Sequence, residues 1–297
     1  MSRVAFLCRI AVCVCFVLAS DALRADEGSV LLRFKFAPNQ TLNYVTSTES
    51  TIVTKFDEED PIKTENSTVA VKQYKVLNVL PTGSAEFEVM LKSVKMRAKV
   101  GDNDPEEFDS NSKDEVARVD FRKIKESIGK PQAVLRFGTI GKLEEVVKIE
   151  DTDFKPHPDE FQTMLMTLPD EPAKVGTDWS ERFTVRVSDQ DDPKLTHEIA
   201  LSRKYNVEKI EGDLVTISMR TAVLTPVRSE FIAVQLSQRE MRGEIVFDNA
   251  RGLIVSRDLK VVKEVINGLG AKTLFQASTT HTEKLEELGT EAKSASN

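Results

Sequence analysis

Apolar and polar residues alternate over most of this chain, and a period of two residues is typical of a β-strand buried on one face. In the segment 30–36, for example, Leu32, Phe34 and Phe36 share one face. The same alternation predicts strands over 30–36, 42–54, 69–80, 85–100, 133–137, 143–149, 181–187, 196–210, 214–224, 242–247, 253–265 and 272–285.

Helix-like spacing of apolar residues occurs in two segments. One covers 112–128 and ends at Gly129, and the other covers 159–168, where Asp159 can cap the start and Pro169 ends the helix. Strands with one polar face and short turns favour an antiparallel sheet whose other face is covered. We therefore predict a mainly β protein, built as a curved antiparallel sheet or half-barrel with one or two short covering helices.

Two parts of the chain repeat the same order of signals. The run Lys-Gln-Tyr-Lys-Val at 72–76 precedes a turn at Gly83, and the run Arg-Lys-Tyr-Asn-Val at 203–207 precedes a turn at Gly212. This pattern indicates an internal duplication with two similar β units, over 30–150 and 174–285. The alternative is that any antiparallel β protein contains such strand–turn–strand units.

The first 25 residues have the composition of a secretory signal peptide. Arg3 precedes an apolar stretch over 4–19, and small residues follow at Ala22 and Ala25. We predict cleavage after Ala25, with cleavage after Ala22 as the alternative. The uninterrupted apolar run over 10–19 is short compared with the roughly 20 residues of a membrane span. An exported protein, periplasmic or extracellular, is expected, and not an integral membrane protein.

The cysteines bear on the redox chemistry of the mature chain. All three lie inside the predicted signal peptide, at Cys8, Cys13 and Cys15. The mature chain would therefore have no disulfide and no thiol nucleophile. The remaining residues are expected to form a single β-rich domain over 26–288 and a disordered tail over 289–297.

Composition and motifs exclude several classes of function. The chain has 297 residues, of which 40% are hydrophobic, as in a globular protein. Its net charge of -7 argues against binding to nucleic acid, whose phosphates require a basic surface. The sequence contains no G-x-S-x-G, H-E-x-x-H, P-loop or dinucleotide-binding motif. We predict that it is not an enzyme and holds no cofactor. A hydrolase whose two carboxylates meet only in the fold stays an alternative.

Metal binding is not expected either. The three histidines, His157, His197 and His281, are far apart in the sequence. Acidic clusters at 57–60, 102–107 and 189–192 could offer oxygen ligands to calcium, but none matches a calcium-loop motif, and solvated turns are the simpler interpretation.

A curved sheet with a helix across its concave face encloses a space, which is either a packed core or a pocket for a lipid. The helix over 159–168 would be the cover. The apolar residues that we expect to line this space are Phe34, Phe36, Phe87, Leu91, Phe161, Leu165, Ile217, Met219 and Phe247, with Val89 and Ile254 beside them.

Three short segments carry a resemblance to a known family. They are 32–40 (LRFKFAPNQ), 168–179 (from Leu-Pro to Val-Gly-Thr-Asp-Trp) and 243–253 (from Gly-Glu-Ile-Val-Phe-Asp to Gly-Leu). Together they resemble a family of secreted bacterial proteins of unknown function known from planctomycetes. The resemblance implies export and a β-rich domain, but no catalytic residues. The architecture is also distantly similar to periplasmic lipoprotein carriers with a curved sheet.

These observations lead to one functional hypothesis and one alternative. The hypothesis is an exported, non-catalytic β protein that binds an apolar ligand or lipid in a curved-sheet cavity. The alternative is a structural or protein-interaction module of the cell envelope, without a small-molecule ligand, whose sheet face or edge contacts an envelope protein.

Overall fold

A computed structural model describes residues 28–113, 119–150, 161–189, 192 and 195–286. The predicted signal peptide, the tail 289–297 and His157 lie outside the described residues. The strands are β1 (Thr41–Phe56), β2 (Ile62–Val79), β3 (Ala85–Val100), β4 (Glu106–Asp109), β5 (Pro131–Phe137), β6 (Leu143–Ile149), β7 (Asp178–Ser188), β8 (Thr196–Glu211), β9 (Leu214–Val223), β10 (Arg242–Asp248), β11 (Leu253–Ile266) and β12 (Thr273–Leu285); the helices are α1 (Val119–Ser127) and α3 (Glu230–Leu236).

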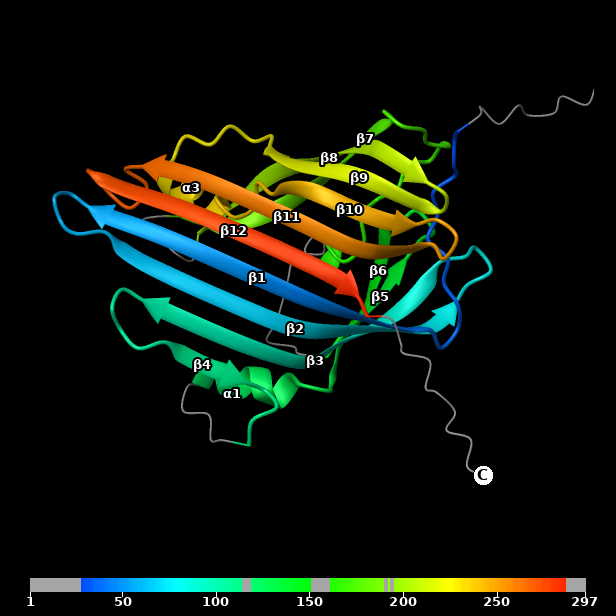
Figure 1. Cartoon of the computed structure of the whole chain (residues 1–297), viewed down its shortest axis with the longest axis horizontal. Coiled ribbons are helices and arrows are strands. Elements are labelled where there is room, and N and C mark those ends of the chain that lie inside the picture. Colours follow the sequence, from blue (N-terminus) through cyan, green and yellow to red (C-terminus); the bar gives the residue numbers. More distant parts are fainter. Residues whose placement is uncertain (1–27, 114–118, 151–160, 190–191, 193–194, 287–297) are drawn as a thin grey trace, which may run out of the picture.

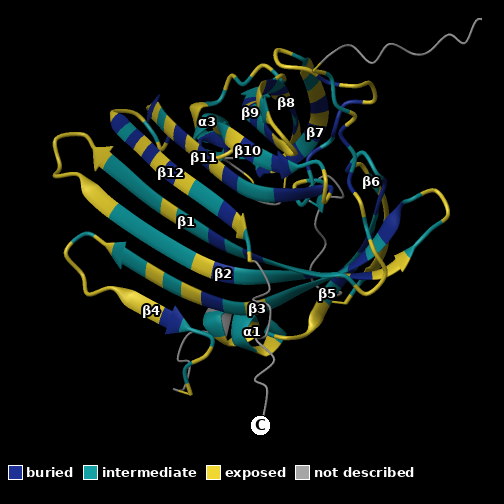
Figure 2. Cartoon of the chain, turned by 45° about the vertical axis from the view of Figure 1, so that its right-hand side comes forward, coloured by how far each residue is buried: buried dark blue, intermediate teal, exposed yellow. Residues whose placement is uncertain are grey.

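All twelve strands belong to one antiparallel sheet, as the alternation predicts. The order is β6-β5-β3-β2-β1-β12-β11-β10-β9-β8-β7, with β4 paired to β3. Figures 1 and 2 show the sheet strongly curved, and its end strands β6 and β7 are not paired with each other, so the sheet stays open. The mainly β, curved antiparallel fold is therefore confirmed.

The order of strands divides the sheet at the pair formed by the first and last strands. The N-terminal half consists of β1 to β6 and the C-terminal half of β7 to β12. Each half is a meander, and the two meet where residues 44–56 of β1 pair with all of β12.

The two halves match in local detail. In both, an insertion separates the third and fourth strands of the meander: β4 and α1 in one, α3 in the other. Val76 pairs with Phe87 just before an extra residue in β2, and Val207 pairs with Ile217 just before an extra residue in β8. A β-bulge bends a strand and fixes the register on either side. The matching bulges agree with the repeat in the sequence, but its common origin stays a prediction.

The segment 30–36 is not a strand, contrary to the prediction. Its alternation is real, because Leu32 and Phe34 are buried and Lys35 is exposed. Its backbone, however, bonds to loops: Phe34 N–H donates to the Thr139 carbonyl at 2.8 Å, and Lys35 N–H donates to the Gly252 carbonyl at 3.2 Å. Periodicity reports burial on one face, and it does not report which backbone supplies the hydrogen bonds.

The predicted covering helix over 159–168 is also wrong for most of its described part, because only residue 161 is helical and residues 162–168 form turns and irregular structure. Gln162 holds this cover: its side-chain oxygen accepts from Leu143 N–H at 2.7 Å, and its amide donates to the Gly141 carbonyl at 2.8 Å. Gly141 has φ +76°, and a Cβ there would lie 2.2 Å from the Met166 carbonyl oxygen. Glycine therefore allows the cover to approach the β5–β6 turn.

Of the other predicted helix, over 112–128, the described helical part is Val119–Ser127, and residues 112 and 113 are not helical. The short β4 and α3 were not predicted. Within the described residues, no helix has the length and apolar character needed to cross a bilayer.

Aromatic rings form the main core between the curved sheet and the 30–36 segment. Phe34 packs edge-on against Phe247 at 5.3 Å between ring centroids, and Phe36 packs edge-on against Phe87 at 5.0 Å. One Phe from each half thus contacts the same segment, which joins the halves by apolar burial.

Candidate functional site

A cavity of about 380 Å³ lies on the inner, core-bearing face of the sheet. This volume is in the range of small-molecule sites, which are usually mostly apolar with a few placed polar groups. Its walls come from both halves, from the cover 163–166 and from the loop after α3. The apolar walls include Leu165, Phe183, Met219, Met241, Ile245 and Leu259, and the charged ones are Lys72, Arg203, Arg239, Arg257 and Glu283.

On the C-terminal side of the cavity, a buried carboxylate neutralises Arg203. Glu181 lies directly opposite Arg203 in the β7–β8 register, and the two side chains are only 7% and 14% exposed. Arg203 donates to Glu181 at 2.9 Å, and the Tyr205 hydroxyl donates to the same oxygen at 2.7 Å. Burial, and then the charge of Glu181, raise the pKa of Tyr205 well above its ordinary value, so this hydroxyl keeps its proton.

A second buried ion pair lines the cavity near the seam, between the last two strands of the C-terminal half. Arg257 on β11 lies opposite Glu283 on β12 and donates to it at 2.7 Å; the side chains are 9% and 5% exposed. Arg257 also donates to the Met164 carbonyl at 2.7 Å, which ties the cover to the sheet. The charges of both buried pairs are therefore compensated within the protein.

Lys72 is the exception among the inner cations. It lies opposite Tyr44 on β1 and Leu91 on β3, neither of which is a carboxylate. No described residue forms a hydrogen bond or ion pair with its ammonium group, although Glu283 attracts it from a distance. Burial lowers the pKa of Lys72 below its ordinary value, and Glu283 offsets only part of this effect. The cavity therefore contains a half-buried cation without a direct partner.

His281 on β12 also lines the cavity, two strands away from Lys72 on β2. Its Nδ1 is 2.8 Å from the Thr48 hydroxyl. Burial lowers the pKa of His281, Glu283 opposes this shift, and the charges of Lys72 and Arg257 reinforce it. His281 is therefore neutral at neutral pH, and between these two residues the positive charge belongs to Lys72.

Of the nine predicted lining residues, two line the cavity and the other seven pack elsewhere in the core. Leu165 and Met219 do line the cavity. Phe34, Phe36, Phe87 and Leu165 surround a gap of only about 10 Å³, so the rings pack against one another there. Ile217 and Phe247 are fully buried, Phe161 packs against the N-terminal core cluster, and Leu91 packs against a separate cluster near α1. Whether any of them contacts a ligand stays a prediction.

The sequence analysis missed the charged residues of the cavity, although a signal for them existed. Lys72 and Arg203 each precede a buried tyrosine, Tyr74 or Tyr205, by two positions. In a strand, residues two apart point to the same face. Each cation therefore points toward the core side, where an unpaired charge is costly and a functional role is worth testing.

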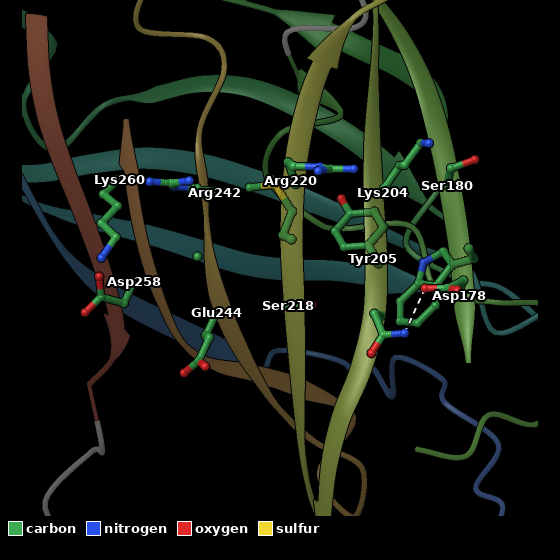
Figure 3. A pocket seen from close by; sticks show the side chains of 14 residues that line it. Asp178, Ser180, Lys204, Tyr205, Ser218, Arg220, Arg242, Glu244, Asp258 and Lys260 are labelled. Atoms are coloured by element: carbon green, nitrogen blue, oxygen red, sulfur yellow. Dashed lines mark hydrogen bonds between the residues drawn. The ribbon is translucent and has the colours of Figure 1, made fainter. Parts of the chain in front are cut away.

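The opposite, outer face of the C-terminal half has an open groove of about 1070 Å³ (Figure 3). Its floor carries two parallel rows of side chains across the strands. Lys204, Arg220, Arg242 and Lys260 stand directly opposite one another on β8, β9, β10 and β11. The next row contains Asp178, Asn206, Ser218, Glu244 and Asp258. We call these the basic row and the polar row.

Gly243 allows β10 to pair closely with β11, so that both rows continue from one strand to the next. It lies between Arg242 of the basic row and Glu244 of the polar row, and a Cβ at this position would lie 1.9 Å from the Asp258 carbonyl oxygen. Only a residue without a side chain lets β10 approach β11 this closely.

The described residues show no group of three or more His, Cys, Asp or Glu side chains that could hold a metal ion. The cavity combines apolar walls with buried and half-buried cations. Comparison with protein-family models finds no match, and neither does comparison with curated proteins. Among solved structures, one of lipovitellin, concerned with lipid–protein interactions, is similar with a TM-score of 0.44 and 9% identity. The similarity covers 85% of this chain, which spans only 25% of that one.

Proposed function

We propose that this protein is an exported, non-catalytic binding protein that holds an apolar ligand with one anionic group, such as a fatty acid or an anionic lipid, in the inner cavity. The observation that carries this proposal is Lys72, a half-buried cation without a direct partner in a cavity with largely apolar walls.

Charge accounting supports an anionic group on the ligand. Glu181 neutralises Arg203, and Glu283 neutralises Arg257. Lys72 is then left without a paired carboxylate, and Arg239 is exposed at the cavity wall. A buried charge is stable only with a counter-charge or hydrogen bonds, and a ligand carboxylate or phosphate would supply both. The apolar walls would hold the tail of the same ligand by burial.

A pair of probes that share one tail tests the proposal. Oleate and oleyl alcohol differ in the carboxylate, and their binding to the chain starting at Asp26 can be measured by calorimetry. We expect oleate to bind at least tenfold more tightly than the alcohol. Lys72→Met should remove this difference but still bind the alcohol. The control is Lys75→Met, at an exposed position of β2 outside both sites, which should leave both affinities unchanged.

Two results would overturn the proposal. Failure of both probes to bind would remove the apolar-ligand function and favour the envelope interaction module. Equal binding of oleate by the original chain and by Lys72→Met would remove the role of Lys72 in recognising an anionic group.

A further inference from the structure

The basic row of the outer groove points away from the core, so its cations lie on the opposite face of the sheet from the inner cavity. All four of its cations are exposed. Like charges placed directly opposite in a sheet destabilise it. Here three such pairs occur side by side: Lys204 with Arg220, Arg220 with Arg242, and Arg242 with Lys260. No described residue forms an ion pair or a side-chain hydrogen bond with any of the four, so the basic row has no direct partner within the described fold.

We propose that the groove binds a linear acidic polysaccharide, with its carboxylate or sulfate groups on the basic row and its hydroxyl groups on the polar row. Neighbouring strands are about 4.8 Å apart, so the four cations span roughly 14 Å in a line across the strands. A polysaccharide with one acid group per sugar ring places several acid groups over this length.

The polar row distinguishes this ligand from other anionic partners. Asp178, Glu244 and Asp258 would repel a flat anionic surface that covered both rows. The same carboxylates accept hydrogen bonds from sugar hydroxyls, which polyphosphate and acidic peptides lack. Asn206 already donates to Asp178 at 2.8 Å, which holds that carboxylate in place.

An extended acidic peptide also fits the basic row poorly. Its side chains on one face recur every two residues, or about 6.7 Å. Over the three intervals of the basic row, this repeat would drift out of step with the cations by roughly 6 Å. Recognition of hydroxyl groups by the polar row is therefore the feature that favours the polysaccharide.

The test uses oligogalacturonate as the probe, with a neutral oligoglucan, polyphosphate and polyglutamate as comparisons. We expect the full chain from Asp26 to bind oligogalacturonate, in a salt-dependent way, more tightly than the other three. Arg220→Gln/Arg242→Gln should weaken this binding at least tenfold and reduce the salt dependence. The control Lys75→Gln/Lys148→Gln removes the same charge from exposed positions of the N-terminal half and should change the affinity less than twofold.

A second variant separates sugar recognition from simple charge attraction. Glu244→Val/Asp258→Val removes two negative charges beside the basic row, so attraction alone predicts tighter binding. Recognition of hydroxyl groups predicts at least threefold weaker binding, because the acceptors are lost. Thermal unfolding of each variant checks the fold, and Arg220→Gln/Arg242→Gln should unfold at the same or a higher temperature because repulsion is relieved.

Three outcomes would overturn the proposal. The first is no binding of oligogalacturonate at low salt. The second is equal loss in the basic-row variant and its control, which would show unspecific charge attraction. The third is polyphosphate or polyglutamate binding as tightly as oligogalacturonate, which would show a polyanion site without sugar recognition.

Discussion

The two halves of the sheet have the same strand meander and the same bulge after an inner valine, yet their charges differ on both faces. On the inner face, Lys72 and Arg203 each lie two positions before a buried tyrosine. Arg203 has Glu181 opposite it, whereas Lys72 has Tyr44. One half therefore neutralises its inner cation, and the other leaves it to the cavity.

On the outer face, it is the C-terminal half that carries the basic row, whose cations have no ion-pair partners among the described residues. Lys204 and Arg220 form a cross-strand pair in the C-terminal half, just before the pair Tyr205–Met219. In the N-terminal half, the pair before Tyr74–Val89 is Gln73 with Met90, which has no charge. A shared backbone pattern thus carries an unpaired inner cation in one half and an outer basic row in the other. Strand pairing sets where side chains point, and single residues decide what each face can bind.

Removing the counter-ion of Arg203 should have the largest effect. Glu181→Leu leaves a guanidinium that is 14% exposed without its carboxylate and takes an acceptor from Tyr205 and Thr167. Breaking one side of a buried pair costs about 3–5 kcal/mol of unfolding free energy. Urea denaturation measures this loss. The variant would have an inner cation without a paired carboxylate in its C-terminal half, as the original chain has at Lys72 in its N-terminal half.

Two further variants control this prediction. Glu198→Gln breaks an ion pair with Arg186 whose side chains are 60% and 52% exposed, and it should cost only about 0–1 kcal/mol. Glu181→Leu/Arg203→Met should recover much of the lost stability. A loss below about 1 kcal/mol for Glu181→Leu alone would show that Glu181 does not support Arg203.

Giving Lys72 a carboxylate partner should make the N-terminal half resemble the C-terminal half, in which Arg203 already has one. Leu91 lies opposite Lys72 and is half-buried, so Leu91→Glu places a carboxylate beside the free ammonium. We expect about tenfold weaker oleate binding, equivalent to about 1.4 kcal/mol, because the new carboxylate competes with that of the ligand. Calorimetry measures the affinity. Leu91→Gln is the matched control without charge, and equal affinities of the two variants would contradict the prediction.

The pH dependence of stability should show a smaller difference between the two inner cations. Burial lowers the pKa of Lys72 below 10.5, so the unfolded chain binds its proton more tightly than the folded one. The resulting cost is fully present below the folded pKa and disappears as the pH rises through that pKa toward 10.5. Relative to Lys72→Met, the original chain should therefore gain stability between pH 7 and 10.

Arg203→Met serves as the matched comparison for this measurement. Arginine stays protonated over the same range, so its removal should change the level of stability but not the slope. Urea denaturation at several pH values gives both slopes. A flat difference between the original chain and Lys72→Met would contradict the assigned burial of Lys72.

Sequence patterns predicted most of the fold, because alternation in a strand depends on local burial. Eleven of the strands in the sheet were anticipated in nearly the right place, and the missed one, β4, is only 4 residues long. The 30–36 segment shows the limit of periodicity: it alternates like a strand but bonds to the loops at Thr139 and Gly252. The 159–168 segment shows another, since Gln162 fixes a non-helical cover through contacts distant in sequence.

The candidate sites were predicted less well than the fold. The expected cavity lining was chosen for apolar character, and Phe34, Phe36 and Phe87 instead pack together around a gap of about 10 Å³. The charged residues that the strands contribute to the cavity include Lys72, Arg203 and Arg257. They lie at strand positions whose side chains point to the inner face, but a search for apolar residues alone does not select them.

The sequence by itself determined the strands, the turns and the face on which each side chain lies, because these follow from the two-residue period and from glycine in turns. Only the tertiary structure decided which side chains became neighbours. The partners of Arg203 and Lys72, and the alignment of four cations from four strands, depend on the pairing register and on bulges that shift it by one residue. Register is set by contacts across the whole sheet, so the charges that define both sites could be placed only in the folded chain.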